Sequence, residues 1–155
     1  MRPTIIFGGY GFIGNQLYNK IKKDKYRFTS LDQNKYSLIF FSKLIKKYNP
    51  KNIFFLSGIS HPSISENKHL LDIKENNIKI QNLLEAAKKN NFFGKIIYAS
   101  SIAVYGSNNK KKVKENDLLN PESHYAVSKI NAENQCMYYA NKFKLNILFK
   151  CKCKN

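Results

Sequence analysis

The feature that most restricts the fold of this chain is a glycine pattern that directly follows an apolar N-terminal run. The run predicts a strand over 3–7, and Gly8, Gly11 and Gly14 lie where this strand would turn into a helix over 12–22. In such a unit the first glycine allows the tight turn, the second lets the backbone approach a pyrophosphate, and the third lets the helix pack closely on the sheet. The phosphates would lie at the positive N-terminal end of the helix. The pattern predicts a dinucleotide site, with glycines of an ordinary strand-to-helix turn as the alternative.

Short apolar runs alternate with segments of helical periodicity along the rest of the chain. Strands are predicted over 3–7, 28–31, 53–56, 95–99 and 145–149, and helices over 12–22, 38–48, 70–90 and 123–143. The side chains predicted to face the core from the first and third helices are Phe12, Ile13, Leu17, Ile21, Ile73, Ile80, Leu83, Leu84 and Ala87. The run over 53–56 predicts a strand covered on both faces. Strands that alternate with helices pair in parallel through right-handed crossovers, so the predicted fold class is α/β, a Rossmann-like doubly wound parallel sheet.

Length and charge limit the possible functions. At 155 residues the chain is expected to form one domain over 1–150, followed by a short tail over 151–155. The formal net charge of +17 suggests nucleic-acid binding, but Arg2 and Arg27 are the only arginines and the lysines are spread along the chain. A solvated basic surface without a nucleic-acid partner is therefore predicted. A basic nucleic-acid binder is kept as an alternative that would lose affinity steeply with salt.

The cysteines and the apolar start indicate a soluble, cytoplasmic protein. Cys136, Cys151 and Cys153 are odd in number and lack a C-x-x-C spacing, so reduced thiols and no metal site are predicted. The apolar residues over 4–7 are interrupted by Gly8, which leaves a run far too short for a signal peptide or a membrane span. No membrane partner is expected.

Asp32 is a candidate for recognising the adenosine ribose. It follows Gly14 by 18 residues (32 − 14), close to the spacing at which a carboxylate accepts hydrogen bonds from ribose hydroxyls and repels a 2′-phosphate. The cofactor is therefore predicted to be NAD, with NADP less favoured. An aspartate in a turn is the alternative. Only about twenty residues separate Asp32 from the strand over 53–56, so a helix and a strand are merged or absent there, and Asp32 could belong to the adenine edge instead.

Ser101, Tyr125 and Lys129 form a candidate catalytic group. Tyr125 and Lys129 are four residues apart on one predicted helix, so both side chains reach the same face. A lysine ammonium and an oxidised nicotinamide would stabilise the tyrosine phenolate, which can then accept a proton while hydride leaves the same carbon. Ser101 follows a predicted parallel strand, where active sites of this architecture collect. A surface pair on a helix is the alternative for Tyr125 and Lys129 taken alone.

At this point the chain resembles the NAD-dependent epimerase/dehydratase family of the extended short-chain dehydrogenase/reductases, which act on nucleotide sugars. The resemblance runs in order through Phe7–Gly14 (FGGYGFIG), Phe55–Gly58 (FLSG), Asn76 ahead of Asn82–Ala87 (NLLEAA), Tyr98–Gly106 (YASSIAVYG) and Tyr125–Lys129 (YAVSK). It implies catalytic roles for Ser101, Tyr125 and Lys129. It also implies cofactor contacts from Gly8, Gly11, Phe12, Ile13, Gly14, Leu56, Ser57, Gly58, Asn76, Tyr125 and Lys129. For Asn76, a capping or inter-helix amide is the alternative.

Two departures from the family pattern shape the expected function. Dehydratases of the family carry an Asp-Glu pair after the Ser/Thr, whereas this chain has Ile102 and Ala103, which cannot transfer a proton. Epimerase-type chemistry is therefore expected, although Ser60-His61 is similar to a dehydratase segment; His61 is taken as a loop residue. Family members also continue into a substrate domain, so a truncated form is expected, with a nucleotide sugar as substrate and a homodimer or a complementing chain as partner. A catalytically inactive NAD-binding fragment, or a dehydratase or reductase of the same family, is the alternative.

Overall fold

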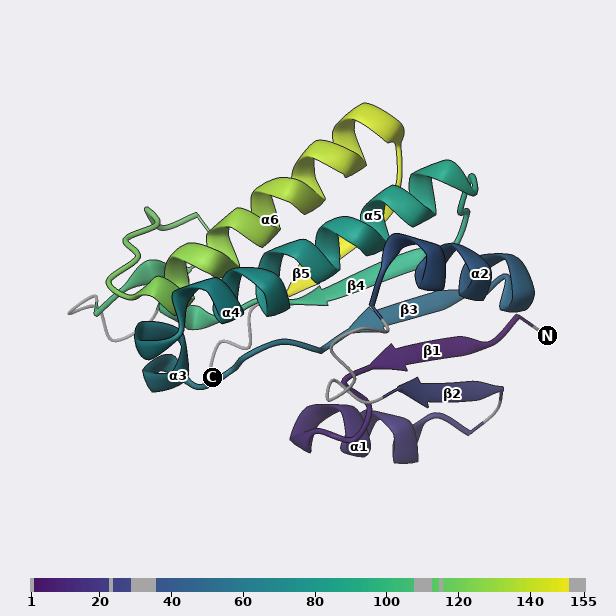
Figure 1. Ribbon diagram of the computed structural model, residues 1–155, viewed down its shortest axis with the longest axis horizontal. Helices are drawn as coiled ribbons and strands as arrows, with labels where there is room; N and C mark the ends of the chain where they lie inside the picture. The colour runs from purple at the N-terminus through teal and green to yellow at the C-terminus, as the bar shows by residue number, and fades with distance from the viewer. Residues whose placement is uncertain (1, 23, 29–35, 108–112, 115, 151–155) are drawn as a thin grey trace.

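A computed structural model of the protein describes residues 2–22, 24–28, 36–107, 113–114 and 116–150. At its centre is a sheet of five strands, paired in parallel in the order β2-β1-β3-β4-β5 (Figure 1). The strands are β1 Thr4–Phe7, β2 Lys25–Phe28, β3 Asn52–Phe55, β4 Lys95–Ala99 and β5 Asn146–Lys150. Their carboxyl ends share one edge of the sheet, and the strand order changes direction between β1 and β3, where open α/β sheets commonly bind ligands. The prediction of a Rossmann-like parallel sheet is confirmed.

The helices cover the two faces of the sheet unequally. They are α1 Phe12–Lys20, α2 Leu38–Tyr48, α3 Pro62–Asn67, α4 His69–Ile73, the π-helix η1 Lys74–Ile78, α5 Lys79–Lys89, the 3₁₀-helix η2 Ile102–Tyr105 and α6 His124–Phe143. Helices α2, α5 and α6 lie together on one face, and α1 lies on the other (Figure 1). The short helices α3 and η2 were not predicted, since six and four residues are too few to show a helical period. His61, expected in a loop, is the residue before α3.

Two predicted elements differ from the structure. The second strand begins at Lys25, three residues before the predicted start at Phe28 (28 − 25), and residues 29–31 lie outside the described part. The helix predicted over 70–90 is continuous but contains the π-helical segment η1, and Ile73 is 39% exposed instead of facing the core. A π-turn inserts one extra residue per turn, so the 3.6-residue period predicted for the whole segment does not hold before η1. Downstream of η1 the prediction is confirmed, because Ile80, Leu83, Leu84 and Ala87 are buried.

The core lies between the sheet and helices α2, α5 and α6. Alternate strand residues point toward it, and the cluster includes Ile5, Phe7, Ile53, Phe55, Ile96, Tyr98, Phe41, Leu44, Ile45, Leu83, Ala132 and Cys136. Phe7 lies at its centre, with ring centroids 5.1 Å from Phe41, 5.2 Å from Tyr36 and 6.0 Å from Phe55. Such edge-to-face and tilted aromatic contacts favour one arrangement of α2 over the end of β1. The packing thereby fixes the position of the turn that follows Phe7.

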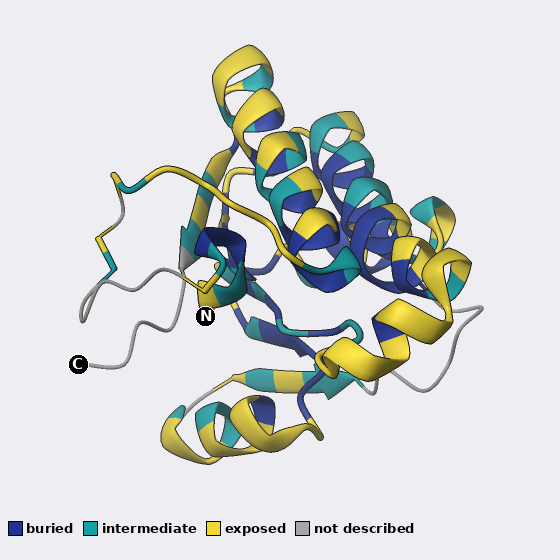
Figure 2. Cartoon of the chain, turned by 90° about the vertical axis from the view of Figure 1, so that its left-hand side faces the viewer, coloured by how far each residue is buried: buried dark blue, intermediate teal, exposed yellow. Residues whose placement is uncertain are grey.

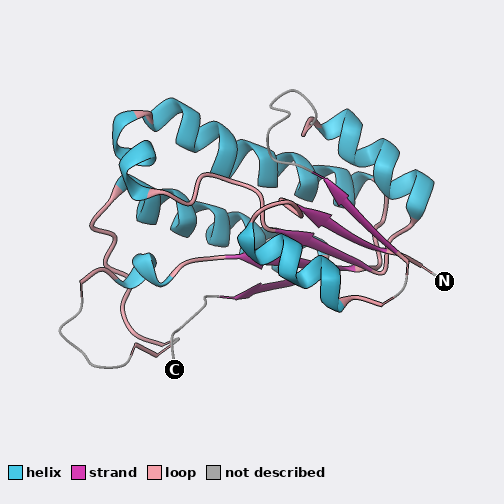
Figure 3. Cartoon of the chain, turned by 90° about the horizontal axis from the view of Figure 1, so that it is seen from below, coloured by secondary structure: helices cyan, strands magenta, loops and turns pink. Residues whose placement is uncertain are grey.

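The opposite face of the sheet is only partly covered. Ile6, Phe54, Ile97 and Leu148 are aligned in register across four strands on this face. Ile6 is fully buried, Phe54 and Ile97 are half-buried, and Leu148 is 43% exposed. Helix α1, itself largely exposed, crosses only part of this face (Figures 2 and 3). The prediction that the strand over 53–56 is covered on both faces is therefore confirmed for one face and only in part for the other, because α1 is the only helix on this side in the described part of the chain.

Candidate functional site

The glycine turn lies at the carboxyl end of β1, next to the point where the strand order changes direction. Gly11 is the residue before α1, with φ of −72° and no side-chain cap, and the first turn of α1 contains no acidic residue. The first backbone N–H groups of a helix have no partner within the helix and attract anions. The nine-residue helix α1 therefore presents an uncapped N-terminus at the expected position of a pyrophosphate.

The three motif glycines are required for different steric reasons. A Cβ on Gly14 would lie 2.2 Å from the Gly8 carbonyl oxygen, so only glycine lets α1 pack on the turn. Gly8 has φ of +75°, and a Cβ there would lie 2.7 Å from the Leu56 backbone at the end of β3. A Cβ on Gly11 would meet only the Gly8 oxygen, at 3.3 Å, which leaves the rest of its surroundings open for a ligand to approach the backbone.

Phe12 and Ile13 are placed differently from the periodicity prediction. They are 77% and 49% exposed, and within α1 only Gly14 is buried, so neither side chain faces the core. The close contact between Gly14 and the turn sets the orientation of α1 and rotates these two residues outward. Leu17 and Ile21 are half-buried. The cofactor contacts implied for Phe12 and Ile13 would thus come from the exposed first turn.

The end of β3 provides polar atoms next to the glycine turn. The Oγ atom of Ser57 and the Oδ1 atom of Asn76 are buried and accept no hydrogen bond from any described residue. Gly58, with φ of +142°, lies against Asn76, since a Cβ there would be 2.2 Å from Oδ1. Buried polar atoms without partners are uncommon in folded proteins and suggest a missing ligand or water. The residues present therefore fit a dinucleotide that supplies hydrogen-bond donors at this edge.

The π-helix η1 connects this region to α6. It buries three consecutive polar residues, Glu75, Asn76 and Asn77, which a regular α-helix would distribute around its axis. Asn77 Nδ2 donates to the Ser128 carbonyl oxygen at 2.7 Å, and Asn76 Nδ2 donates to Asp72 Oδ1 at 2.6 Å. Asn76 Nδ2 also lies 3.4 Å from Ser128 Oγ. The side-chain nitrogen of Asn76 therefore acts as the inter-helix amide that was the alternative prediction. Its side-chain oxygen faces Gly58 instead.

Ser101 lies between β4 and η2, whereas Tyr125 and Lys129 lie on α6. Ser101 follows β4, is half-buried, and its Oγ atom accepts a hydrogen bond from the Ala103 N–H at 3.2 Å, which leaves the hydroxyl proton available to donate. Tyr125 lies in the first turn of α6 and is buried, with its ring centroid 5.7 Å from Lys129 Nζ. The structure therefore places the tyrosine and the lysine together on α6, as predicted from their spacing.

Lys129 is an unusual lysine because it is almost completely buried. Its Nζ atom donates to the Tyr98 hydroxyl and to the Ala99 carbonyl oxygen, each at 3.2 Å. Burial lowers the pKa of Lys129 to about 8, although the carboxylates of Asp72 and Glu133 favour its charged form. A buried lysine with a pKa near neutrality is typical of functional sites. Neither Tyr98 nor Glu133 was identified from the sequence, since their contacts join β4 to α6 across about thirty residues of chain.

Other predicted features lie away from this edge or outside the described residues. Asp32 belongs to the segment that the structure does not describe, so the preference for NAD over NADP stays a prediction. Cys136 is buried, and burial raises the pKa of its thiol to about 12. Among the described residues, no group of His, Cys, Asp or Glu side chains is arranged to hold a metal ion. Every helix in the described part of the chain is too short or too polar to span a bilayer.

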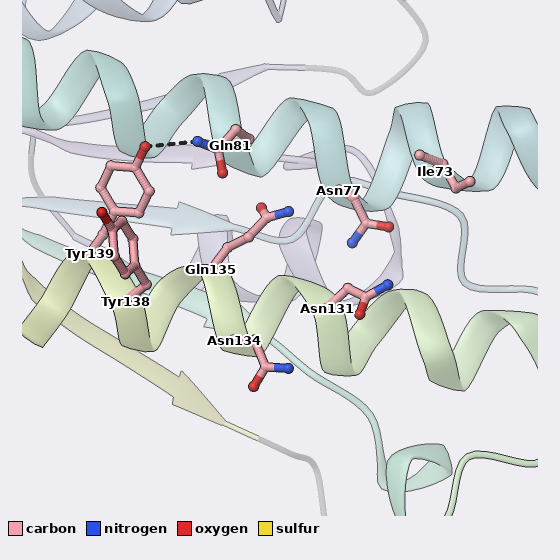
Figure 4. Close-up of a pocket in the computed structure, with 8 residues that line it drawn as sticks. All are labelled: Ile73, Asn77, Gln81, Asn131, Asn134, Gln135, Tyr138 and Tyr139. Atoms are coloured by element: carbon pink, nitrogen blue, oxygen red, sulfur yellow. Dashed lines mark hydrogen bonds between the residues drawn. The ribbon is translucent and has the colours of Figure 1, made fainter.

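One cavity of the described residues lies away from the candidate site. It has a volume of about 590 Å³ and lies between α6 and the continuous helix formed by α4, η1 and α5, on their side away from the sheet (Figure 4). Its lining is mostly amides and tyrosines, and a hydrogen bond of 2.7 Å joins Gln81 to Tyr139 across the two helices. We assign the site to the carboxyl edge of the sheet because the glycine turn, the unpartnered oxygens and the buried lysine meet there.

Comparisons with known proteins agree with this architecture. The model of the NAD dependent epimerase/dehydratase family matches residues 4–150. The uncharacterized UDP-glucose epimerase YtcB of Bacillus subtilis (strain 168) is 34% identical over 97 residues, which make up 62% of this chain and 30% of that protein.

Solved structures show the same fold over nearly the whole chain. UDP-N-acetylglucosamine 4-epimerase from Methanobrevibacter ruminantium M1, in complex with UDP-N-acetylmuramic acid, superposes with a TM-score of 0.83 at 24% identity, over 96% of this chain and 53% of that one. UDP-glucose 4-epimerase from Brucella ovis, in complex with NAD, superposes with a TM-score of 0.81 at 21% identity, over 97% and 51%. The chain thus spans about half the length of these structures.

Proposed function

Since the chain belongs to the NAD dependent epimerase/dehydratase family, we propose that it is an NAD-dependent oxidoreductase domain that takes part in the epimerisation of a nucleotide sugar. The observation that carries the proposal is the buried Lys129, which lies beside Tyr125 at the sheet edge where the glycine turn and Ser101 also lie. The Brucella ovis relative is a UDP-glucose 4-epimerase in complex with NAD, which supports the choice of cofactor and substrate class. The chain spans about half the length of that protein.

The cofactor is proposed to lie across the carboxyl ends of β1 and β3. The N-terminus of α1 would hold its pyrophosphate, with Gly8, Gly11 and Gly14 allowing the approach and Phe12 and Ile13 donating backbone N–H groups. Leu56, Ser57, Gly58 and Asn76 would line the opposite side, where two buried oxygens lack partners. When bound, the nicotinamide supplies a hydride acceptor for the sugar carbon and returns the hydride to it. Asp32 is proposed to bind the adenosine ribose, which favours NAD over NADP.

Tyr125, Lys129 and Ser101 are proposed to divide the proton chemistry among them. The Tyr125 phenolate would accept the proton of the sugar hydroxyl, and the charged Lys129 would stabilise that phenolate. Ser101 would donate its free hydroxyl proton to the substrate oxygen, since its own oxygen already accepts from the Ala103 N–H. Neither Ile102 nor Ala103 can supply a further acid or base, which favours epimerisation over dehydration.

A catalytically inactive NAD-binding module is the second candidate. The specific observation in its favour is that Tyr125 is buried, so little of its side chain is open to a sugar. In this case the residues at the sheet edge bind the dinucleotide, but no sugar reaches Tyr125. The two candidates predict the same cofactor affinity and opposite results for turnover.

NAD titration by calorimetry, combined with an assay that interconverts UDP-glucose and UDP-galactose, tests both candidates. We expect the wild type to bind NAD saturably, the Gly11→Val variant to lose binding because its side chain fills the open approach, and Tyr125→Phe to keep binding. Turnover that disappears in Tyr125→Phe would establish the enzyme. NAD binding without turnover of any tested nucleotide sugar would favour the inactive module, and a folded wild type that binds no NAD would contradict both.

A further inference from the structure

Glu133 connects α6 to the end of β4, directly before Ser101. It lies one helical turn after Lys129, and its Oε1 atom accepts a hydrogen bond from the Ser100 hydroxyl. Lys129 binds the two residues before Ser100, which end β4, through the Tyr98 hydroxyl and the Ala99 carbonyl oxygen. Two side chains one turn apart therefore bind three consecutive residues, the last two of β4 and Ser100. The backbone that carries Ser101 is thereby attached to the helix that carries Tyr125.

Glu133 is also one of two carboxylates that act on the buried charge of Lys129. The ionisable groups that face Lys129 are Asp72 from α4, Tyr98 from β4, and Tyr125, Glu133 and Cys136 from α6 itself. Asp72 is fully buried and its oxygens face Ser65, Asn76 and His124.

Cys136 does not add negative charge at neutral pH, because burial keeps its thiol protonated. Burial likewise raises the pKa of the Tyr98 hydroxyl well above its usual range, so Tyr98 is a neutral partner of Lys129. Glu133 and Asp72 therefore supply the negative charge that offsets the desolvation of the ammonium group.

We propose that Glu133 is a positioning residue, which keeps Lys129 charged and holds the Ser100–Ser101 backbone at a set distance from Tyr125. This inference rests on the proposed function, because it gives Glu133 a role through Lys129 and Ser101 and no contact with substrate. A carboxylate suits both tasks: its charge stabilises the ammonium group, and its oxygen accepts from the serine hydroxyl. Glutamine at this position would preserve the hydrogen bond and remove the charge, whereas alanine would remove both.

The charge on Lys129 can be measured without any cofactor. In a chain labelled with ¹³C at the lysine Cε atoms, the Lys129 resonance is the one that a Lys129→Arg variant lacks. In the wild type we expect this resonance to titrate with a midpoint near pH 8. In Glu133→Gln the midpoint should fall by roughly half a pH unit to one pH unit, because one of two nearby negative charges is gone. An unchanged midpoint in Glu133→Gln would overturn the electrostatic part of the proposal.

Glu85→Gln is the matched control for this titration. Glu85 is also a half-buried carboxylate that accepts a hydrogen bond from a hydroxyl, that of Tyr139, but it is not among the groups that face Lys129. We expect the Lys129 midpoint to be the same in Glu85→Gln as in the wild type. A shift of equal size in both variants would mean that any lost carboxylate has this effect, and would also overturn the proposal.

Amide hydrogen exchange at Ser100 and Ser101 tests the second part. Glu133→Ala should exchange about tenfold faster at these two amides than the wild type, whereas Glu133→Gln should exchange at the wild-type rate. Equal rates in all three proteins would show that Glu133 does not hold this segment. Neither readout requires NAD, so a chain that binds no cofactor would contradict the proposed function while the Lys129 midpoint and the exchange rates still decide the role of Glu133.

Discussion

The motif glycines differ in the space around them. A substitution at Gly14 should therefore affect stability, whereas one at Gly11 should affect NAD binding. Gly14→Ala would place a methyl group 2.2 Å from the Gly8 carbonyl oxygen, and we expect it to lower the free energy of unfolding by about 3 kcal/mol. Gly11→Ala meets a single oxygen at 3.3 Å, so its loss should be within about 1 kcal/mol. Its methyl group would instead obstruct the pyrophosphate, and NAD affinity should fall.

Urea unfolding and NAD calorimetry on both variants check this prediction. Equal stability losses would show that the two glycines share one steric role. A Gly11→Ala variant that binds NAD like the wild type would place the pyrophosphate elsewhere.

Lys129 lowers the free energy of unfolding at neutral pH, because its charged form is buried at the candidate site. Its native pKa of about 8 is lower than the value of 10.5 for an unperturbed lysine, so between these pH values the unfolded chain binds more protons than the native one. The free energy of unfolding therefore rises with pH in this window on account of Lys129. Relative to a Lys129→Met variant, the wild type should gain roughly 2 kcal/mol between pH 7 and pH 9.5.

The difference between the two unfolding curves isolates this one residue from the many exposed lysines, which are present in both proteins. Urea unfolding at the two pH values is the measurement. A difference that does not change with pH would mean that Lys129 titrates alike in the folded and unfolded chains.

At the scale of the element, α6 is preceded by a capping serine, Ser123, that determines where its first turn starts. Ser123 Oγ accepts the Ala126 N–H at 3.1 Å, and Tyr125 lies in the turn that this bond closes. We expect Ser123→Ala to lower the free energy of unfolding by about 1 kcal/mol and Ser123→Asp to retain it, since an aspartate also caps a helix. Thermal unfolding followed by circular dichroism measures both effects.

Ser37 offers a control of the same kind, because its Oγ atom accepts the Phe40 N–H at the start of α2. Ser37→Ala should cost about the same stability without changing NAD affinity. If Ser123→Ala were as stable as the wild type, the first turn of α6 would have to be held by tertiary contacts instead.

At the scale of the whole molecule, the two faces of the sheet predict how the chain behaves in solution. Leu148 is 43% exposed on β5, an edge strand of the described sheet, beside the half-buried Ile97. Edge strands with exposed apolar side chains promote association between chains. We expect Leu148→Ser to reduce self-association in light scattering while circular dichroism shows unchanged helix content.

Phe93→Ser is the comparison variant. Phe93 is 85% exposed in the segment between α5 and β4, and it does not belong to the apolar residues aligned across the partly covered face of the sheet. Single exposed apolar residues are common on soluble proteins, so this change should affect self-association less. If Phe93→Ser reduced self-association more than Leu148→Ser, the chains would associate through the segment before β4 instead of through β5.

The order of the elements and most of the candidate site were determined by local sequence. Helix α2 and strand β4 have the predicted bounds, because each combines a clear period with a clear end, and the motif glycines lie where the first strand turns into a helix. The spacing of Tyr125 and Lys129 was sufficient to place them together on α6, since residues four apart share one face of a helix.

Tertiary structure alone decided the features that depend on contacts between distant segments. Phe12 and Ile13 face outward because Gly14 packs on the turn. The pattern of apolar residues in α1 does not predict that contact. The π-turn at Asn76 and Asn77 is stabilised by hydrogen bonds that include one to Ser128, about fifty residues later. The low pKa of Lys129 arises from desolvation in the assembled core, which is a property of the packed molecule and of no single segment of its sequence.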